Sequence, residues 1–526
     1  MEYFLFSLIV YFVFVSIKSK RTIHMLQQNY YNESNRYVLW VFKNLKKVFI
    51  NFDILVFLSV LAFLFSFDHA ILYASLVGAI SCFIYYAYNR REQTKKPLVV
   101  TSRVKRLVIT IFLIYAAIVF GICYTFSEDK LWFYYLLVSL SIYFNWVIVT
   151  VANFLNKPIE KYVYHYYKSK AMKKMKEMNI PVVGITGSYG KTSSKNILWD
   201  ILNTRLTPFK TPSNFNTPYG LIRSINNYLD KFNDIFIAEM GAFKKGEIKT
   251  TCKLMKPKYG ILTIIGQAHL ESFGSQENIQ KGKFELIESL PSDGIGILNA
   301  DDPLQKNYKL KNDCQIIWIG IEADADYKAS DIKLSHKGTN FKVTFKDGHT
   351  CDFETRLLGR HNIYNILAGI ALGSALGLND DELKRGVSSI APIEHRLELK
   401  KMGDITIIDD AYNSNPVGSK MALDVLDLMP GTKIVVTPGM IELGEKQYEL
   451  NNKFGEYIAD VADYVILVGE EQTKPILDGL KNKKYDEKKI YVLNNVVDAF
   501  PLMNKLKKGE TYVLLENDLP DLFNER

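Results

Sequence analysis

The sequence predicts a multidomain protein in which an α-helical transmembrane region precedes two α/β domains. Three observations support this prediction. The first third of the 526 residues holds long apolar runs, the stretch VVGITGSYGKTSSK reads as a strand entering a glycine-rich turn and a helix, and the last third alternates short apolar strands with helical patterns. The predicted divisions are a transmembrane region over 1–153, a basic connector over 154–178, a central α/β domain over 179–387 and a C-terminal α/β domain over 388–526.

Each apolar run is close to the roughly 20 residues that cross a bilayer core. The runs lie near 1–17, 48–67, 69–88, 107–126 and 131–153. They predict about five transmembrane helices, although the 48–88 region also reads as a single hairpin. The first run lacks a basic start and precedes KSKR, which is typical of a retained anchor rather than a cleaved signal peptide. Buried core helices of a soluble protein are the alternative interpretation.

Basic residues predict the orientation of these runs. The loops over 18–47 and 89–106 each carry seven lysines and arginines, whereas the alternate loops FDHA and SEDK are short and have little excess positive charge. By the positive-inside rule, the N-terminus lies outside and everything after residue 153 is cytoplasmic. Asp53 and Asn145 are strongly polar residues within the runs, and either can mark a functional site. Because Asp53 is near the end of its run, we expect it at the membrane interface.

Composition excludes some classes of function. The net charge of +9 lies largely in loops beside the apolar runs, which indicates a membrane surface rather than nucleic acid. There is no zinc-finger spacing and no RNA-binding signature. The five cysteines are scattered without a CxxC pair, as in proteins whose thiols stay reduced, and none is needed for chemistry.

The glycine-rich turn is typical of a phosphate-binding loop. Gly184, Gly187 and Gly190 give the spacing GxxGxxG, which matches neither a strict Walker A motif nor the dinucleotide motif GxGxxG. Small residues let backbone N–H groups face phosphates, Lys191 can reach the terminal phosphates, and the Thr192 hydroxyl can bind Mg²⁺. The helix that follows adds its N-terminal dipole. A purely structural glycine-rich turn is the alternative.

Glu239 ends another apolar strand, at a switch into a loop. A carboxylate there can hold, together with Thr192, the Mg²⁺ that bridges the phosphates of ATP. The alternative is an ordinary acid at the end of a strand.

The turn and eight later segments resemble the Mur ligase family, the ATP-dependent amide-forming enzymes of peptidoglycan precursor synthesis. The segments are TPSNFNTPYGL, IFIAEMGAFKKGEI, IIGQAHLESFGSQENIQKGKFELI, GILNADDP, LLGRHNIYNILAGIALG, HRLEL, IIDDAYNSNP and PGMIELG. They follow in the family's order over about 260 residues, and the subgroup that adds the D-alanyl-D-alanine dipeptide is the most similar. The resemblance implies an ATP-binding central domain and a Rossmann-like C-terminal ligase domain.

The resemblance also implies roles for individual residues. His269 would bind a second Mg²⁺, and Lys283 would be carbamylated into a carboxylate-like metal ligand, with Lys281 as the neighbour that is easily confused with it. Asn365 would contact adenine. The implied catalytic residues are Lys191, Lys283 and His269. The implied metal ligands are Thr192, Glu239, His269 and Lys283. The implied ATP contacts are Gly187, Gly190, Lys191, Thr192, Ser193, Asn365, Arg396 and Asp410. The implied substrate contacts are Asn214, Asn216, Thr217, Asn413 and Asn415.

The implied reaction has two stages. An acceptor carboxylate, on a muramoyl-peptide-like molecule, attacks the γ-phosphate of ATP and becomes an acyl phosphate. The amine of an amino acid or dipeptide then forms the amide and releases phosphate. Closure of the C-terminal domain would exclude water from the acyl phosphate. The implied location is a bacterial-type cell membrane, with the α/β domains in the cytoplasm.

Two departures from the family limit the substrate assignment. In soluble members of the family, an N-terminal domain binds the UDP-sugar of the acceptor, but here the apolar runs and the connector stand in its place. Either the acceptor is already linked to a membrane lipid, or the spans only tether the enzyme to the membrane. The chain also has the acidic stretch YVLLENDLPDLF where a Lys-Gly-Ser type loop is expected, and PGMIELG lacks the usual aspartate. Two alternatives remain: a ligase that modifies a capsule-like polymer, and a membrane transport or regulatory P-loop ATPase.

Overall fold

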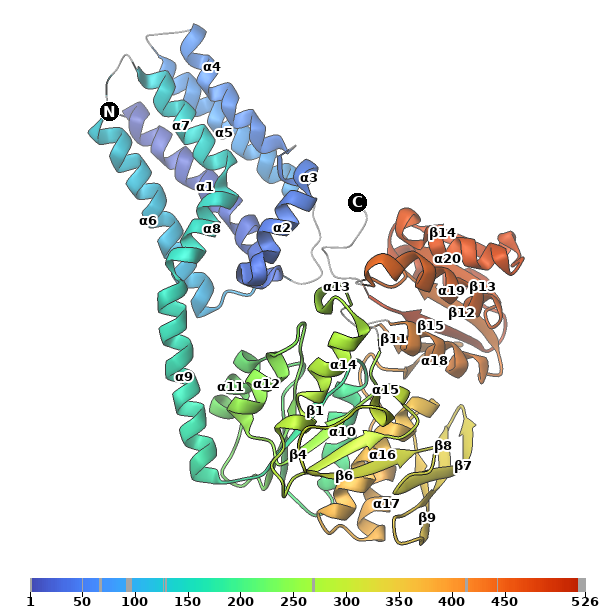
Figure 1. Ribbon diagram of the computed structural model, residues 1–526. Helices are drawn as coiled ribbons and strands as arrows, with labels where there is room; N and C mark the ends of the chain where they lie inside the picture. The colour runs from blue at the N-terminus through green and yellow to red at the C-terminus, as the bar shows by residue number, and fades with distance from the viewer. Residues whose placement is uncertain are drawn as a thin grey trace. The chain divides into compact units, whose positions relative to one another are not determined.

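The computed structural model describes residues 2–49, 51–65, 69–90, 97–125, 127, 130–266, 270–411, 415–441 and 443–518. They form two compact units, Met1–Tyr166 and Tyr167–Arg526. The first unit is helical and the second contains two β-sheets with flanking helices (Figure 1).

The helical unit contains both long helices and short broken ones. Its elements are α1 (Glu2–Gln28), η1 (Tyr30–Asn35), α2 (Arg36–Lys43), α3 (Leu45–Phe49), η2 (Phe52–Phe57), α4 (Leu58–Phe65), α5 (Ala70–Asn89), α6 (Ser102–Tyr124), α7 (Leu131–Tyr143), α8 (Asn145–Leu155) and the start of α9 (Lys157–Met178). Among the described residues, α1, α5 and α6 are each long and apolar enough to cross a membrane. The pair α7 and α8 would make a fourth span, bent by 69°.

Two of the five predicted runs are therefore not continuous helices. The run near 48–67 contains α3, η2 and α4 over its described part, and the run near 131–153 breaks between Tyr143 and Asn145. Partners from other helices lie at the second break, where the side-chain amide of Asn145 donates to Ser19 Oγ at 2.9 Å and to the Tyr115 hydroxyl at 2.8 Å. The backbone carbonyl of Tyr143 at the break accepts a hydrogen bond from Lys18, and such polar partners compensate for the backbone hydrogen bonds that a break removes from an apolar helix.

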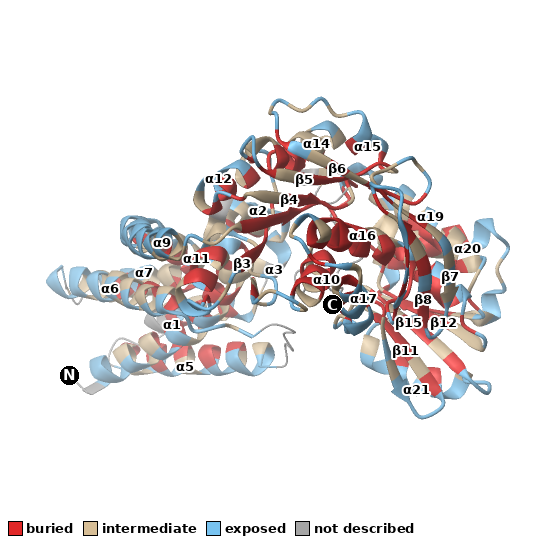
Figure 2. Cartoon of the chain, turned by 90° about the horizontal axis from the view of Figure 1, so that it is seen from below, coloured by how far each residue is buried: buried red, intermediate tan, exposed pale blue. Residues whose placement is uncertain are grey.

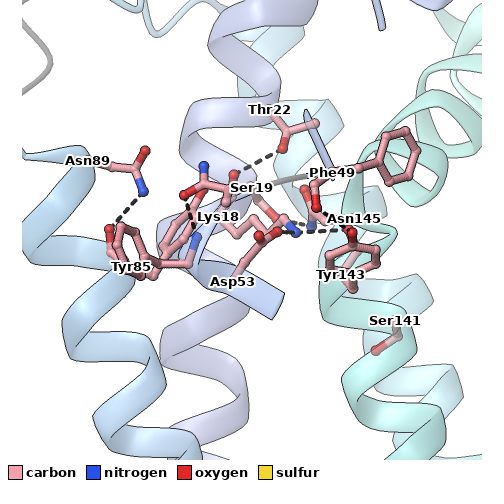
Figure 3. A network of polar contacts seen from close by, with 12 residues as sticks. Lys18, Ser19, Thr22, Phe49, Asp53, Tyr85, Asn89, Ser141, Tyr143 and Asn145 are labelled. Atoms are coloured by element: carbon pink, nitrogen blue, oxygen red, sulfur yellow. Dashed lines mark hydrogen bonds and ion pairs between the residues drawn. The ribbon is translucent and has the colours of Figure 1, made fainter. Parts of the chain in front are cut away.

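Asp53 is a buried residue of η2 with a charged partner. Its carboxylate accepts a hydrogen bond from the Lys18 ammonium, and both side chains are buried within the helical unit (Figure 3). Lys18 also donates to the carbonyl of Tyr143 at 2.8 Å, at the end of α7. Asp53 thus differs from the expected interfacial aspartate, because it pairs with a lysine that the sequence assigned to a basic loop.

The larger sheet of the second unit is mostly parallel. Its order is β2-β3-β1-β4-β5-β6-β7-β8-β9, and only β7-β8-β9 pair antiparallel. The strands are β1 (Val182–Thr186), β2 (Pro208–Lys210), β3 (Ile235–Glu239), β4 (Tyr259–Leu262), β5 (Ile295–Asn299), β6 (Gln315–Gly320), β7 (Tyr327–Ser335), β8 (Gly338–Thr344) and β9 (Thr350–Thr355). The helices are α10 (Lys191–Leu202), α11 (Pro218–Asn227), α12 (Glu247–Met255), α13 (Leu270–Phe273), α14 (Gln276–Phe284), η4 (Ile287–Ser289), α15 (Pro303–Lys306), α16 (Arg360–Ala375) and α17 (Asp380–Ser389).

The core of this domain lies between the sheet and the helices that pack on it. β1 and β3 are buried along their whole length, as expected for apolar parallel strands covered on both faces. α10 and α16 contribute buried isoleucines and leucines to the same core, and both appear largely buried in Figure 2. Since β1, β3 and β4 run parallel, their carboxyl ends and the loops that follow meet at one edge of the sheet.

The second sheet has the order β10-β11-β15-β12-β13-β14. Its strands are β10 (Glu398–Met402), β11 (Ile405–Asp410), β12 (Thr432–Thr437), β13 (Tyr464–Val468), β14 (Ile490–Leu493) and β15 (Thr511–Glu516), and its helices are α18 (Pro416–Asp427), η5 (Gly444–Lys446), α19 (Gln447–Ala459), α20 (Glu470–Asn482), η6 (Glu487–Lys489), η7 (Val496–Asp498) and α21 (Ala499–Leu506). The short apolar strands of the last third, ITIID, KIVVTPG, YVILVG and YVLLE, correspond to β11, β12, β13 and β15. The edge strand β10, with the sequence ELKKM, has no strong apolar pattern, and β14, with the sequence IYVL, is apolar but only four residues long; the sequence did not predict either strand.

Candidate active site

The phosphate loop joins β1 to α10. A Cβ atom at Gly187 would lie 1.9 Å from Thr263 Oγ1, so only glycine fits there. Gly190 caps α10 with φ +81°, a left-handed conformation that favours glycine. The first backbone N–H groups of α10, from Lys191 through Ser193, have no earlier helical turn to bond to. The loop therefore offers a helix N-terminus of the kind that binds phosphate.

Lys191 folds back over this loop. Its ammonium donates to the carbonyls of Gly187 at 2.8 Å and Ser188 at 3.1 Å. Burial lowers the pKa of Lys191 to about 8, and the nearby Glu239 opposes that shift. A lysine in this place is available to neutralise a phosphate group that enters the loop.

Glu239 is the centre of the polar contacts at the sheet edge. Its side chain is buried, with an exposed fraction of 1%. Thr192 donates to both of its carboxylate oxygens, and Asn216 donates to Oε1 at 3.1 Å. Lys195 lies 3.0 Å from Oε2. Burial raises the pKa of Glu239, but the two nearby lysines outweigh it, so the pKa falls below its ordinary value and the carboxylate is ionised.

This donor set fits Mg²⁺. A carboxylate and a hydroxyl, both hard oxygen ligands, lie side by side next to a phosphate loop, and Mg²⁺ is commonly bound by one or two carboxylates together with substrate phosphates. No cluster of three histidine, cysteine or acidic side chains suited to a metal occurs among the described residues. His269, the implied ligand of a second ion, lies outside the described residues.

Lys283 and Lys281 differ in their burial and in their contacts. Lys281 is a partly exposed residue that pairs with Glu277 one turn away, at 2.5 Å. Lys283 is 2% exposed; its amine lies 3.5 Å from the Ala242 carbonyl and faces the ring of Phe273. Burial, with the nearby charge of Lys191, places the pKa of Lys283 well below its ordinary value. Burial therefore favours the neutral amine over the ammonium at this position.

Three predicted nucleotide contacts come from later elements. Asn365 of α16 lies against the phosphate turn, because a Cβ at Gly190 would be 3.3 Å from its Oδ1. The charge of Arg396 contributes to lowering the pKa of Lys191 and also acts on Asp410. Asp410 ends β11 beside Glu516 of β15, its partner in register. Burial raises the pKa of Asp410 to about 6.

The predicted substrate contacts differ in their surroundings. Asn216 joins the Glu239 cluster, and Asn214 is exposed in the same loop. Thr217 accepts a hydrogen bond from Gly220 N and caps α11. Asn415 caps α18 in the same way, and Asn413 lies outside the described residues. Thr217 and Asn415 thus have structural roles as helix caps.

Lys195 is a site residue that was not predicted from the sequence. This lysine is 1% exposed and contacts both Glu239 and the carbonyl of Ser213. A signal for it was present, because Lys195 follows Thr192 by three residues and therefore lies on the same face of the helix. A surface position on an amphipathic helix was the simpler interpretation of a lysine.

The fold and the site define a class: proteins with a phosphate-loop α/β domain followed by a second, mainly parallel α/β domain. Two family models match the chain, the Mur ligase middle domain over residues 185–373 and the Mur ligase glutamate ligase domain over residues 395–515. The chain belongs to the Mur ligase family. Neither match extends into the helical unit.

Curated relatives support this assignment. A UDP-N-acetylmuramoyl-tripeptide–D-alanyl-D-alanine ligase of Bacillus subtilis is 33% identical over 56% of this chain and 64% of its own length. The enzyme of that name from Buchnera aphidicola of Acyrthosiphon pisum is 30% identical over 66% of this chain and 78% of its own length. The chain spans less than two thirds of the Bacillus subtilis relative and of an Escherichia coli relative, of which it covers 65%.

Solved structures agree with the fold. The MurF ligase of Thermotoga maritima in complex with ADP matches with a TM-score of 0.61 and 27% identity, over 68% of this chain and 80% of that one. A MurF structure from Acinetobacter baumannii matches with a TM-score of 0.62 at 24% identity, over 68% and 77% of the two chains, which supports the fold alone.

Proposed function

We propose that this chain is a membrane-anchored, ATP-dependent ligase that forms an amide bond in the synthesis of peptidoglycan precursors or another part of the cell envelope. The observation that carries the proposal is the contact of Thr192 with Glu239 beside a phosphate loop, in a chain of the Mur ligase family. The relatives' name, UDP-N-acetylmuramoyl-tripeptide–D-alanyl-D-alanine ligase, and the ADP bound to the Thermotoga maritima neighbour support the same activity.

The residues of the site would act by positioning and by charge. Backbone N–H groups at the start of α10 would hold the phosphates of ATP, and Lys191 would neutralise the terminal one. Asn365 beside Gly190 would hold the nucleotide, with Arg396 and Asp410 contributing from the C-terminal domain. Mg²⁺ held by Glu239 and Thr192 would supply further neutralisation of phosphoryl charge. The acceptor carboxylate would take the γ-phosphoryl group and, as an acyl phosphate, react with the amine.

Carbamylation of Lys283 would complete the metal site with His269. A lysine reacts with carbon dioxide only as the neutral amine, and burial supports that state at Lys283. A carbamate on Lys283 would supply a negatively charged oxygen ligand for the metal, which the unmodified lysine does not have.

The acceptor would be a muramoyl-peptide-like carboxylate, and the amine an amino acid or dipeptide. Asn214, Asn216 and Thr217 of one loop and Asn413 and Asn415 of another would contact these substrates. The helical unit and the positive-inside pattern support a multi-pass location with cytoplasmic α/β domains. An acceptor linked to a membrane lipid would explain why a chain of this family carries such a unit.

The test is phosphate release by the detergent-purified full chain with Mg-ATP. Acceptors would be UDP-linked and lipid-linked muramoyl peptides, each with D-alanyl-D-alanine or single amino acids, and mass spectrometry would identify the amide. We expect product only with the lipid-linked acceptor and none with Lys191→Ala. If product forms only with the UDP-linked acceptor, the helices would anchor the enzyme to the membrane without a role in binding the acceptor. ATP turnover without an amide from any acceptor would overturn the ligase and favour a transport or regulatory ATPase.

A further inference from the structure

Lys195 is a buried lysine that no step of the proposed reaction uses. Its ammonium lies 3.0 Å from Glu239 Oε2 and donates to the Ser213 carbonyl at 2.5 Å. Lys191, one helical turn earlier, donates instead to the carbonyls of Gly187 and Ser188 in the phosphate loop. The two lysines of α10 therefore serve different parts of the site.

Stability alone is a poor explanation for this pair. Removing an ammonium and a carboxylate from water costs several kcal/mol for each ion, so a buried ion pair is on average no better for stability than apolar residues of the same volume. What a fully bonded ion pair does provide is a fixed orientation of each charged group. Here the group whose orientation is fixed is Glu239, the carboxylate beside the phosphate loop.

The loop over residues 211–217 is attached to the same carboxylate. Asn216 donates to Glu239 Oε1 at 3.1 Å, and its own carbonyl accepts from Gly241 N at 2.8 Å. A Cβ atom at Gly241 would lie 2.9 Å from Asn216 Cγ, so the loop approaches the end of β3 as closely as glycine permits. Ser213, which accepts from Lys195, has a left-handed φ of +45°. The loop thus reaches Glu239 through Lys195 on one oxygen and through Asn216 on the other.

We propose that Lys195 is a positioning residue that couples the metal-binding carboxylate to the loop over residues 211–217. Its contact with Glu239 Oε2 orients the carboxylate toward the metal. Its contact with the Ser213 carbonyl holds the loop. Metal binding and the order of the loop would therefore change together. This inference rests on the proposed function, which assigns Glu239 to Mg²⁺ and the loop to a substrate. Lys195 would act through its contacts with Glu239 and Ser213.

The test uses Lys195→Met in the full chain, with Lys174→Met as the matched control. Like Lys195, Lys174 donates to backbone carbonyls, in its case those of Ile225 and Leu229, but it makes no ion pair with Glu239. The readouts are the Mg²⁺ concentration for half-maximal ADP binding, by calorimetry, and hydrogen exchange of the amides over 211–217 at fixed ADP with and without Mg²⁺. Partners that orient a metal ligand are typically worth about 10- to 100-fold in metal affinity.

We expect Lys195→Met to raise the half-saturating Mg²⁺ concentration at least tenfold and to abolish the Mg²⁺-dependent protection of the loop, while Lys174→Met changes neither. Unchanged or tighter Mg²⁺ dependence in a folded Lys195→Met protein overturns the inference, because a merely structural lysine would lower only the melting temperature. If Lys195→Met does not fold, the wild-type protein still tests the inference. Hydrogen exchange over residues 211–217 that does not change with Mg²⁺ at constant ADP also overturns the inference. Failure of the wild type to bind Mg-ADP would instead overturn the proposed function.

Discussion

The hydroxyl of Thr192 lies 3.2 and 3.1 Å from the two carboxylate oxygens of Glu239, so the first turn of α10 and the end of β3 meet at one acidic group. The two residues are 47 positions apart in the chain. The parallel pairing of β1 with β3 brings them together, because it places the phosphate loop and Glu239 at the same edge of the sheet. A metal ligand held in this way needs little rearrangement when the ion arrives.

Replacing Glu239 by glutamine keeps the size of the side chain and removes its charge. We expect ATP turnover to fall by about 100-fold or more, because a neutral amide is a poor ligand for Mg²⁺. The variant also leaves the buried Lys195 without its counter-ion, which typically costs about 3–5 kcal/mol of stability. Phosphate release at saturating Mg-ATP and a thermal melt would measure the two effects.

Glu277→Gln is the matched control for this change. Glu277 is an exposed glutamate that pairs with a lysine, Lys281, but lies outside the site. It should keep wild-type turnover and melting temperature. Wild-type turnover in Glu239→Gln would remove Glu239 from the metal site.

Lys283 should take up carbon dioxide. Carbon dioxide reacts with a neutral amine, and burial lowers the pKa of Lys283 and so favours that form, so protein equilibrated with ¹³C-bicarbonate is expected to show a carbamate carbon resonance by NMR, and activity should rise with bicarbonate after degassing. Lys283→Arg should lose both the resonance and the activity. Lys281→Arg, a change at the partly exposed neighbour, should keep both. A resonance that persists in Lys283→Arg would assign the carbamate to another lysine.

Sequence patterns predicted the α/β domains because parallel strands and phosphate turns have strong local signals. The strands that end at Thr186, Glu239 and Asp410 were visible as apolar runs followed by loops. The membrane unit was harder, since hydropathy reports an apolar run but not a break within it. The bend between Tyr143 and Asn145 depends on partners from other helices, as does the burial of Asp53. Lys195 was missed for the same reason, because its partner comes from a distant strand.

Asp410 should make the stability of the C-terminal domain depend on pH. Burial raises its pKa from 3.8 to about 6, against the opposing charge of Arg396, while Asp409 adds to the rise and Glu516 lies beside it. The folded state therefore holds a proton that the unfolded state releases between pH 4 and 6. Stability contributed by this proton is present below pH 4 and is lost as pH rises to 6, by up to about 3 kcal/mol.

Asp410→Asn removes this ionisation. Relative to wild type, the variant is expected to gain stability steadily from pH 4 to pH 6 and to keep the gain above it, as measured by calorimetric melting over that range. Asp404→Asn, an exposed aspartate of the same domain paired with Lys507, should show no such trend. A variant-minus-wild-type difference that is flat across this range would mean that Asp410 keeps an ordinary pKa.

The ion pair of Lys18 with Asp53 should be the most sensitive contact of the helical unit. Both side chains are buried, and Lys18 also holds the Tyr143 carbonyl at the end of α7, so one ammonium joins α1, η2 and the break before α8 (Figure 3). Removing one partner leaves the other charge buried and unpaired, at a cost of about 3–5 kcal/mol. Lys18→Met should therefore lower the melting temperature of the detergent-solubilised protein sharply.

Replacing both partners separates the charge from the packing. The double variant Lys18→Met with Asp53→Leu removes the unpaired carboxylate, so it should recover much of the stability lost in Lys18→Met, because apolar residues of similar volume often replace a buried pair without loss. Lys20→Met, at an exposed position two residues along α1, should melt as wild type does. If the double variant is as unstable as the single one, the bond from Lys18 to the Tyr143 carbonyl, and not the ion pair, is the contact that holds the break in place.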